Sequence, residues 1–141
     1  SLEQPVEKYQ EILDVNVTAQ YSLLRTVVPL MKKQKNGYIF NIASRSGTYG
    51  FPGGGVYGST KFALVGLSES LYRELARFGV RVTSICPGWV DTSMAREAGT
   101  PLESEHMIQP EDILRTIRYL LSLSQHVRVK QVVLEMDGSI I

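Results

Sequence analysis

The sequence predicts an α/β fold in which about three parallel strands alternate with helices. Short apolar runs with strand propensity alternate along the chain with longer segments whose apolar residues recur at helical spacing. These segments follow the order helix, strand, helix, strand, helix, strand, which is typical of a parallel sheet with right-handed crossovers. With 141 residues, of which 43% are hydrophobic, the chain is long enough for a single globular domain over residues 1–141.

The first part of the chain contains one long helix and one strand. The helix is expected to begin near residue 4, because the proline that follows suits a first helical turn, and to reach about Lys33. Pro29 lies inside this segment and should kink or break the helix. An Asn-Gly pair then forms a helix stop, and residues 38–43 are the first predicted strand.

Two further helices and two strands follow. Residues 44–55 are rich in glycine and serine and predict a loop, after which residues 56–78 carry helical periodicity. This second helix has apolar residues on two faces, one for its own sheet and one for another contact such as a partner subunit. Residues 80–86 alternate as the second strand, a third helix is expected to open at Pro110, and residues 132–136 form the third strand.

Composition excludes several classes of function. Fifteen Lys and Arg residues against fourteen Asp and Glu residues leave a net charge of +1, so no broad positive field is available to bind nucleic acid. Cys86 is the only cysteine, and the two histidines have no neighbouring ligand cluster, so no metal site is expected. No apolar run is long enough to span a membrane and no export signal is visible, which predicts a cytoplasmic protein without membrane contact.

Tyr57 and Lys61 are the first candidates for chemistry. They lie four residues apart at the opening of the second helix, so their side chains share a face. An ammonium about 4 Å from a phenol would lower the phenol pKa by roughly 3 units at an effective dielectric constant near 20, which permits proton exchange near physiological pH. Ser44 follows the first strand directly, at the end of the sheet where α/β proteins bind ligands, and the glycine-rich loop can bring it beside Tyr57.

Four motifs, in order, resemble those of the short-chain dehydrogenases/reductases, which transfer hydride between NAD(H) or NADP(H) and an alcohol or carbonyl. Ser44 precedes Tyr57 by thirteen residues, as in many members of the family. The motifs are DVNVTA (residues 14–19), GYIFNIASRSG (residues 37–47), YGSTK (residues 57–61) and PGWVDT (residues 87–92). The resemblance covers nearly the whole chain and implies that its elements belong to a truncated Rossmann-like, doubly wound parallel sheet.

The resemblance also implies a role for each site residue. Tyr57 would be the general acid/base, Ser44 would orient and polarise the substrate oxygen, and Lys61 would lower the tyrosine pKa and hold the nicotinamide ribose. Asn16 would anchor a water in a proton relay that ends at Lys61. The substrate would be a small-molecule alcohol or carbonyl compound. The residues implied to bind the cofactor, NAD or NADP, are Tyr57, Lys61, Pro87, Gly88, Val90 and Thr92.

Asn16 has two interpretations when only its neighbours are considered. Val15, Val17 and Thr18 are β-branched and have poor helix propensity, so the helix could distort there and admit a water. A capping or solvent-facing asparagine is the alternative, and the neighbours alone favour it. The letters G-x-G-x-x-G beginning at Gly53 are not interpreted as a dinucleotide fingerprint, because the preceding strand ends about ten residues earlier.

The family's first half has no counterpart in this sequence. There is no Thr-Gly-x-x-x-Gly-x-Gly turn and no Asn-Asn-Ala-Gly segment, and the chain begins at Ser1 rather than Met. We therefore expect a fragment that keeps the catalytic residues, lacks the N-terminal cofactor-binding half, binds NAD or NADP weakly or not at all, and is inactive alone. The first strand should have an open edge, which predicts a homo-oligomer through dimerisation, strand exchange or aggregation. The alternative is a non-catalytic interaction or dimerisation module derived from the same fold.

Overall fold

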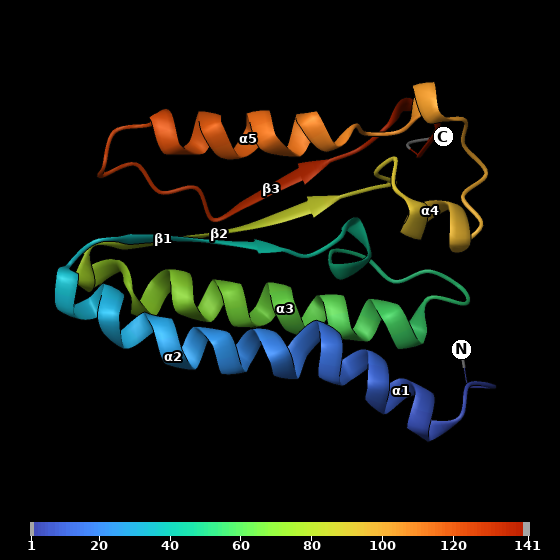
Figure 1. The fold of residues 1–141 in the computed structure, drawn as a ribbon, viewed down its shortest axis with the longest axis horizontal. Coiled ribbons are helices and arrows are strands. Elements are labelled where there is room, and N and C mark those ends of the chain that lie inside the picture. Colours follow the sequence, from blue (N-terminus) through green and yellow to red (C-terminus); the bar gives the residue numbers. More distant parts are fainter. Residues whose placement is uncertain (1, 140–141) are drawn as a thin grey trace.

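Three parallel strands form the centre of the computed structural model, which describes residues 2–139 (Figure 1). The strands are β1 (Gly37–Ile42), β2 (Val80–Pro87) and β3 (Gln131–Leu134), and their order in the sheet is β1-β2-β3. Gly37 pairs with Val80 at the start of β1, and Ser84 pairs with Gln131 at the start of β3. The predicted α/β class with three parallel strands is therefore confirmed.

The α-helices are α1 (Val6–Leu13), α2 (Ala19–Gln34), α3 (Gly55–Glu74), α4 (Ser93–Glu97) and α5 (Pro110–Ser122). All the α-helices except α4 lie close to where the apolar periodicity places them, whereas α4 falls in a polar segment in which no helix is expected. A π-helical turn, Asp14–Thr18, interrupts the long first helix, whereas α2 continues through Pro29. The expected break at Pro29 is therefore wrong. Pro29 and Arg25, whose carbonyl loses its helical donor, are both exposed, so water can satisfy that carbonyl.

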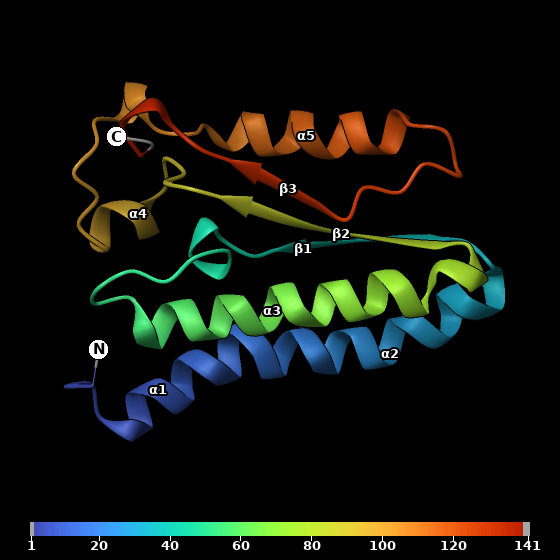
Figure 2. The same ribbon diagram turned by 180° about the vertical axis from the view of Figure 1, so that it is seen from behind.

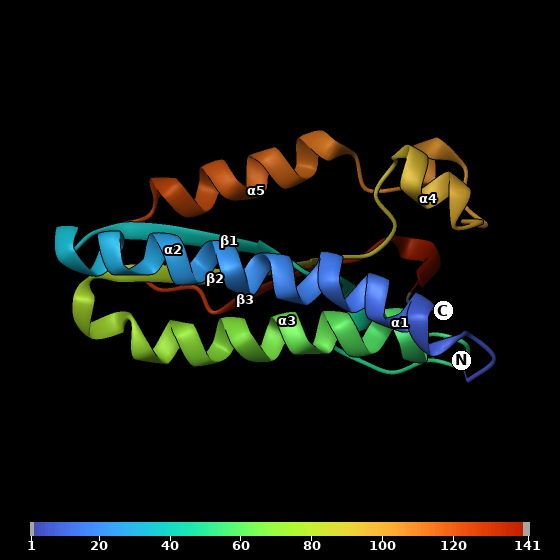
Figure 3. The same cartoon turned by 60° about the horizontal axis from the view of Figure 1, so that its bottom comes forward.

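The sheet has helices on both faces. Helices α2 and α3 lie on one face and α5 lies on the other (Figures 1 and 3), and the view from behind in Figure 2 shows the same separation. The strand order advances in one direction while the connecting helices α3 and α5 lie on opposite faces, so the two crossovers have opposite hands. The expectation that both crossovers are right-handed is therefore wrong. The β2–β3 connection spans residues 88–130 and contains α4, which makes it long enough to reach the other face.

Two buried clusters hold the helices against the sheet. The first packs between the sheet and helices α2 and α3, and it consists of Leu24, Ile39, Leu75, Val80 and Val82. The second lies where β1 and β2 end, and it consists of Ala43, Leu64 and Cys86. Because Leu64 belongs to α3, the second cluster fixes the first half of this helix against the carboxyl ends of the two strands. The residues that follow β1 therefore leave the sheet beside a firmly seated helix.

Within residues 2–139, β1 pairs only with β2, so its other edge is open. Ile42, at the end of β1, is 45% exposed. The open edge agrees with the expectation from the sequence, and how the protein covers it remains a prediction. None of the helices in the described part of the chain has the length and apolar character needed to cross a membrane.

Candidate active site

Ser44 sits at the carboxyl end of β1 and is held there by backbone contacts. Pairing with β2 extends one residue beyond the strand, because the Ala43 N–H donates to the Ile85 carbonyl at 2.8 Å. Ser44 then caps a short 3-10 turn, Arg45–Gly47, and its Oγ accepts a hydrogen bond from the Ser46 N–H at 3.0 Å. The side chain is buried, so its hydroxyl has a defined position at the end of the sheet.

A glycine allows the Ser44 turn to pack directly on α3. A Cβ atom added to Gly47 would lie 2.6 Å from the carbonyl oxygen of Lys61 and 3.0 Å from a methyl carbon of Val65. These distances are too short for a side chain, so only glycine permits the close approach of the two backbones. The close approach brings Ser44 to the first turns of α3, where Tyr57 and Lys61 lie.

The side chains of Ser44 and Tyr57 meet through a hydrogen bond. Burial raises the pKa of Tyr57 above its ordinary value of 10.0, and the hydrogen bond with Ser44 lowers it in part. The spatial association of a hydroxyl and a phenol expected from the sequence is thus present. The phenol therefore keeps its proton at neutral pH, because its ordinary pKa is already 10.0 and burial, which has the larger effect, raises it further.

Lys61 lies beside Tyr57, as the spacing of four residues predicts. Its Nζ is 5.4 Å from the centroid of the Tyr57 ring. Burial lowers the pKa of the Lys61 amine, and the nearby Cys86 thiol raises it in part. The expectation that Lys61 brings the pKa of Tyr57 towards neutrality is wrong for this structure, because burial of the phenol dominates and the amine lies over the ring.

Asn16 reaches the same region from the long first helix. It lies in the π-helical turn Asp14–Thr18, so the helix is distorted where the β-branched neighbours predict it. Its side chain is half-buried, and its Nδ2 donates to Thr60 Oγ1 at 3.1 Å. The capping or solvent-facing alternative for Asn16 is therefore wrong. Thr60 was not singled out in the sequence, although its place between Tyr57 and Lys61 in YGSTK marks it as a neighbour of both.

The segment from Pro87 to Thr92 lies beyond the carboxyl ends of β2 and β3. The Gly88 N–H donates to the Leu134 carbonyl at 2.8 Å, which ties the segment to β3. Val90 pairs with Ile108 through the carbonyl of Trp89 and the N–H of Asp91, so the N–H of Val90 itself points away from that pairing. The Thr92 hydroxyl accepts from the Ala95 N–H at 3.3 Å and caps α4.

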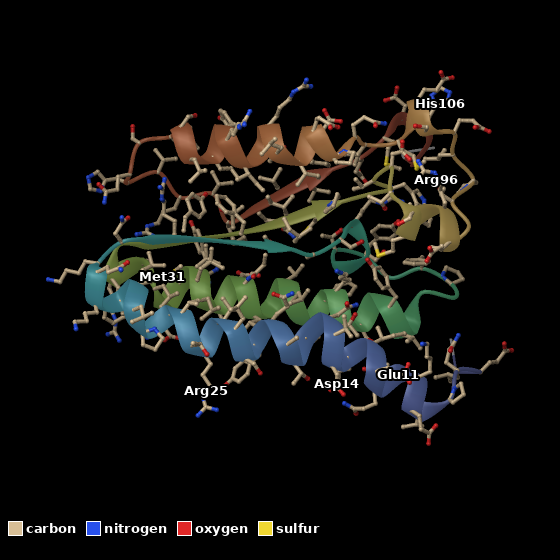
Figure 4. The ribbon with its side chains drawn as sticks, viewed as in Figure 1. Glu11, Asp14, Arg25, Met31, Arg96 and His106 are labelled. Carbon is tan, nitrogen blue, oxygen red and sulfur yellow. The ribbon has the colours of Figure 1, made fainter. Side chains whose placement is uncertain are left out.

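Pro87, Gly88, Val90 and Thr92 therefore form a second group at this end of the sheet. Cys86, the residue before Pro87, raises the pKa of the Lys61 amine in part, so the end of β2 lies near the first group. Arg96 pairs with Asp91, and both Arg96 and His106 lie on the α4 side of the molecule in Figure 4.

Comparison with known proteins gives a family for this geometry. The family model described as short chain dehydrogenase matches residues 1–103. An uncharacterized oxidoreductase of Staphylococcus epidermidis is 39% identical over 127 residues, which cover 90% of this chain and 54% of the relative. An uncharacterized oxidoreductase of Bacillus subtilis is 33% identical over 117 residues, which cover 83% of this chain and 46% of the relative. The chain thus spans about half the length of the curated relatives it matches.

Solved structures agree with the sequence comparison. A betaketoacyl-[ACP] reductase from Bacteroides thetaiotaomicron is 59% identical, with a TM-score of 0.85 over 98% of this chain and 58% of that protein. A serine dehydrogenase complexed with NADP+ is 30% identical, with a TM-score of 0.79 over 94% of this chain and 56% of that protein. The family model and these similarities show that the chain belongs to the short-chain dehydrogenase family.

Proposed function

We propose that this chain carries the proton-transfer machinery of a reaction in which hydride passes between NAD or NADP and an alcohol or carbonyl compound. The hydrogen bond between Ser44 and Tyr57, at the carboxyl end of β1 and beside Lys61, is the observation that supports this most directly. A substrate oxygen placed against both hydroxyls would receive one hydrogen bond from each. Two converging donors polarise a carbonyl and stabilise the negative charge that develops on its oxygen.

In carbonyl reduction, Tyr57 acts as the general acid. The reduced nicotinamide, when bound, supplies the hydride that reaches the carbonyl carbon. Tyr57 gives its phenolic proton to the carbonyl oxygen, Ser44 holds that oxygen, and the product is an alcohol. The phenol of Tyr57 is protonated at neutral pH, which is the form this direction requires, although its raised pKa makes it a weaker acid than a phenol whose pKa lies near neutrality. Asn16 and Lys61 would return a proton to Tyr57 through a relay.

The donors at the site fit the nicotinamide end of the cofactor. The phenol of Tyr57 and the amine of Lys61 can hydrogen-bond ribose hydroxyls, and the N–H of Val90 is directed away from its own strand pairing. The pyrophosphate end lacks a comparable site in residues 2–139, because no strand there leads through a glycine-rich turn directly into a helix: twelve residues separate β1 from α3. We therefore propose that this chain alone binds NAD or NADP weakly and turns over little substrate.

We further propose a β-ketoacyl thioester as the carbonyl substrate. The support is the 59% identity to the betaketoacyl-[ACP] reductase, across 98% of this chain. Serine dehydrogenase, at 30% identity, is a more distant relative and gives weaker support for a hydroxy-acid substrate. A small-molecule partner of this kind needs neither nucleic acid nor a membrane.

A chimera tests the role of Tyr57. This chain replaces the matching part of the Bacteroides reductase, and reduction of a β-ketoacyl thioester is measured by NADPH or NADH consumption. Tyr57→Phe removes only the transferable proton, so we expect kcat to fall roughly 10²- to 10⁴-fold while the circular dichroism spectrum stays the same. Tyr72→Phe is the matched control, because Tyr72 lies on the same helix and packs against the first buried cluster. Undiminished turnover by the Tyr57→Phe chimera would defeat the assignment.

A further inference from the structure

Thr60 joins the two helices that carry the site. It lies in α3 between Tyr57 and Lys61, and its side chain is completely buried. Its Oγ1 is 2.7 Å from the carbonyl oxygen of Tyr57 and 3.1 Å from Nδ2 of Asn16, a residue 44 positions earlier in the chain. A single hydroxyl therefore contacts both the turn that presents the phenol and the π-helical turn that presents the asparagine.

The number of protons at this hydroxyl decides the direction of each hydrogen bond. The Tyr57 carbonyl can only accept, so the single O–H of Thr60 must donate to it. The Thr60 oxygen is then an acceptor towards Asn16, which must present its NH₂ group. The two ends of an asparagine amide have nearly the same shape, so its orientation depends on such contacts. Oδ1 of Asn16 remains as the end of the amide that can accept a hydrogen bond from elsewhere.

We infer that Thr60 is a positioning residue: it sets the orientation of the Asn16 amide, and so determines which end Asn16 offers to a proton relay at Tyr57 and Lys61. The relay itself belongs to the proposed function, on which this inference rests. The π-helical turn makes such a device useful, because Asn16 lies where the helix departs from regular α-helical geometry. The contact with α3 supplies the constraint from outside.

The test follows the side-chain amide protons of Asn16 by nuclear magnetic resonance. Their signal is the one missing from the spectrum of Asn16→Ala. In the unmodified chain, we expect one Asn16 amide proton to exchange with solvent about fivefold more slowly than those of the exposed Asn36. The factor is about five because an ordinary hydrogen bond protects the proton by about 1 kcal/mol. In Thr60→Val, which keeps the shape and removes the hydroxyl, this protection disappears and the signal shifts. In Thr60→Ser, which restores the hydroxyl, both features return.

Thr116→Val is the matched control. Thr116 makes the same kind of bond to its own helix, from Oγ1 to the Asp112 carbonyl at 2.8 Å, but it lies in α5 on the other face of the sheet. This variant should leave the Asn16 signal unchanged. An unchanged Asn16 signal in folded Thr60→Val overturns the inference. An unprotected Asn16 amide in the unmodified chain also overturns it, and this second measurement does not depend on whether any variant folds. Neither measurement requires turnover, so failure of the Tyr57 assignment is distinguishable from failure of this inference.

Discussion

At Tyr57, two effects change the pKa of the phenol in opposite directions. Burial disfavours the charged phenolate and raises the pKa, whereas the hydrogen bond with Ser44 lowers it. Burial also lowers the pKa of Lys61, so it disfavours the charged ammonium that would attract a phenolate. The residues that meet at this site therefore favour a neutral phenol, the form that can donate a proton to a carbonyl oxygen.

Removing the Ser44 hydroxyl should raise the pKa of Tyr57 further. Ser44→Ala leaves burial as the main influence, so the phenol should ionise at a higher pH than in the unmodified chain. The measurement is an ultraviolet absorbance titration, in which the step due to Tyr57 is identified by its loss in Tyr57→Phe. Ser59→Ala is the control, because Ser59 is exposed and its hydroxyl contacts the Val56 carbonyl and Tyr9 instead. A Tyr57 step that moves to lower pH in Ser44→Ala would contradict the prediction.

Gly47 sets how closely the Ser44 turn approaches α3. In Gly47→Ala, the new methyl group would lie 2.6 Å from the Lys61 carbonyl oxygen, so the turn or the helix must move. Overpacking of this kind costs roughly 1–3 kcal/mol of the free energy of unfolding, and we expect the Ser44–Tyr57 hydrogen bond to weaken with it. Urea denaturation measures the cost. Gly50→Ala is the control, since a Cβ atom there meets nothing within 4 Å, and equal midpoints for the two variants would disprove the steric explanation.

Among the elements, α3 contributes most to the site, because it carries Tyr57, Thr60 and Lys61 and packs on both β2 and the Ser44 turn. Only part of this helix is specialised for those contacts. Gly58 is buried, with a Cβ position 3.4 Å from the Ser46 carbonyl oxygen, whereas Gly66 is exposed and has open space around it. The amino-terminal half of α3 is therefore constrained by the site, whereas the exposed position Gly66 in its carboxyl-terminal half has room for a side chain.

Gly66→Ala should stabilise the chain. Alanine loses less backbone entropy than glycine on forming a helix, and the new methyl group meets nothing within 4 Å. We expect a gain of about 0.5–1 kcal/mol in the free energy of unfolding, measured by urea denaturation. The same substitution at Gly58 should give a smaller gain, because its methyl group would contact the Ser44 turn. A destabilised Gly66→Ala would mean that this part of α3 does not have the open surroundings described.

The sequence predicts the parts of the site that depend on local geometry and misses those that depend on packing. Residues four apart on a helix and a serine after a strand follow from periodicity, so Ser44, Tyr57 and Lys61 could be placed together. The contact between Asn16 and Thr60 joins residues 44 apart, and it depends on how two helices pack. The direction of the Tyr57 pKa depends on burial, which residue spacing does not contain.

For the whole molecule, too, local patterns predict some features of the sheet and miss others. Alternating helices and strands predict a parallel sheet, but they do not predict the face on which α5 lies, which the long β2–β3 connection allows to be the opposite one. A separate feature joins β1 and β2. Arg81, on β2, stacks its guanidinium 4.3 Å over the ring of Tyr38 in β1. Among the described residues, Nη1 of Arg81 is the one buried side-chain nitrogen or oxygen without a hydrogen-bond partner, and it belongs to β2, the central strand, and not to the open edge.

The open edge of β1 should make this chain self-associate. Its unpaired backbone groups can bind another strand, and Ile42 adds an exposed apolar side chain at the strand end. Sedimentation over a wide concentration range should show dimers or larger species that increase with concentration. Ile42→Lys places a charge at this edge and should shift the equilibrium towards monomer, whereas Leu121→Lys, on α5 and similarly exposed, should not. A monodisperse monomer at every concentration would show that the β1 edge is not an association surface, and equal effects of the two lysines would assign association to general hydrophobicity instead.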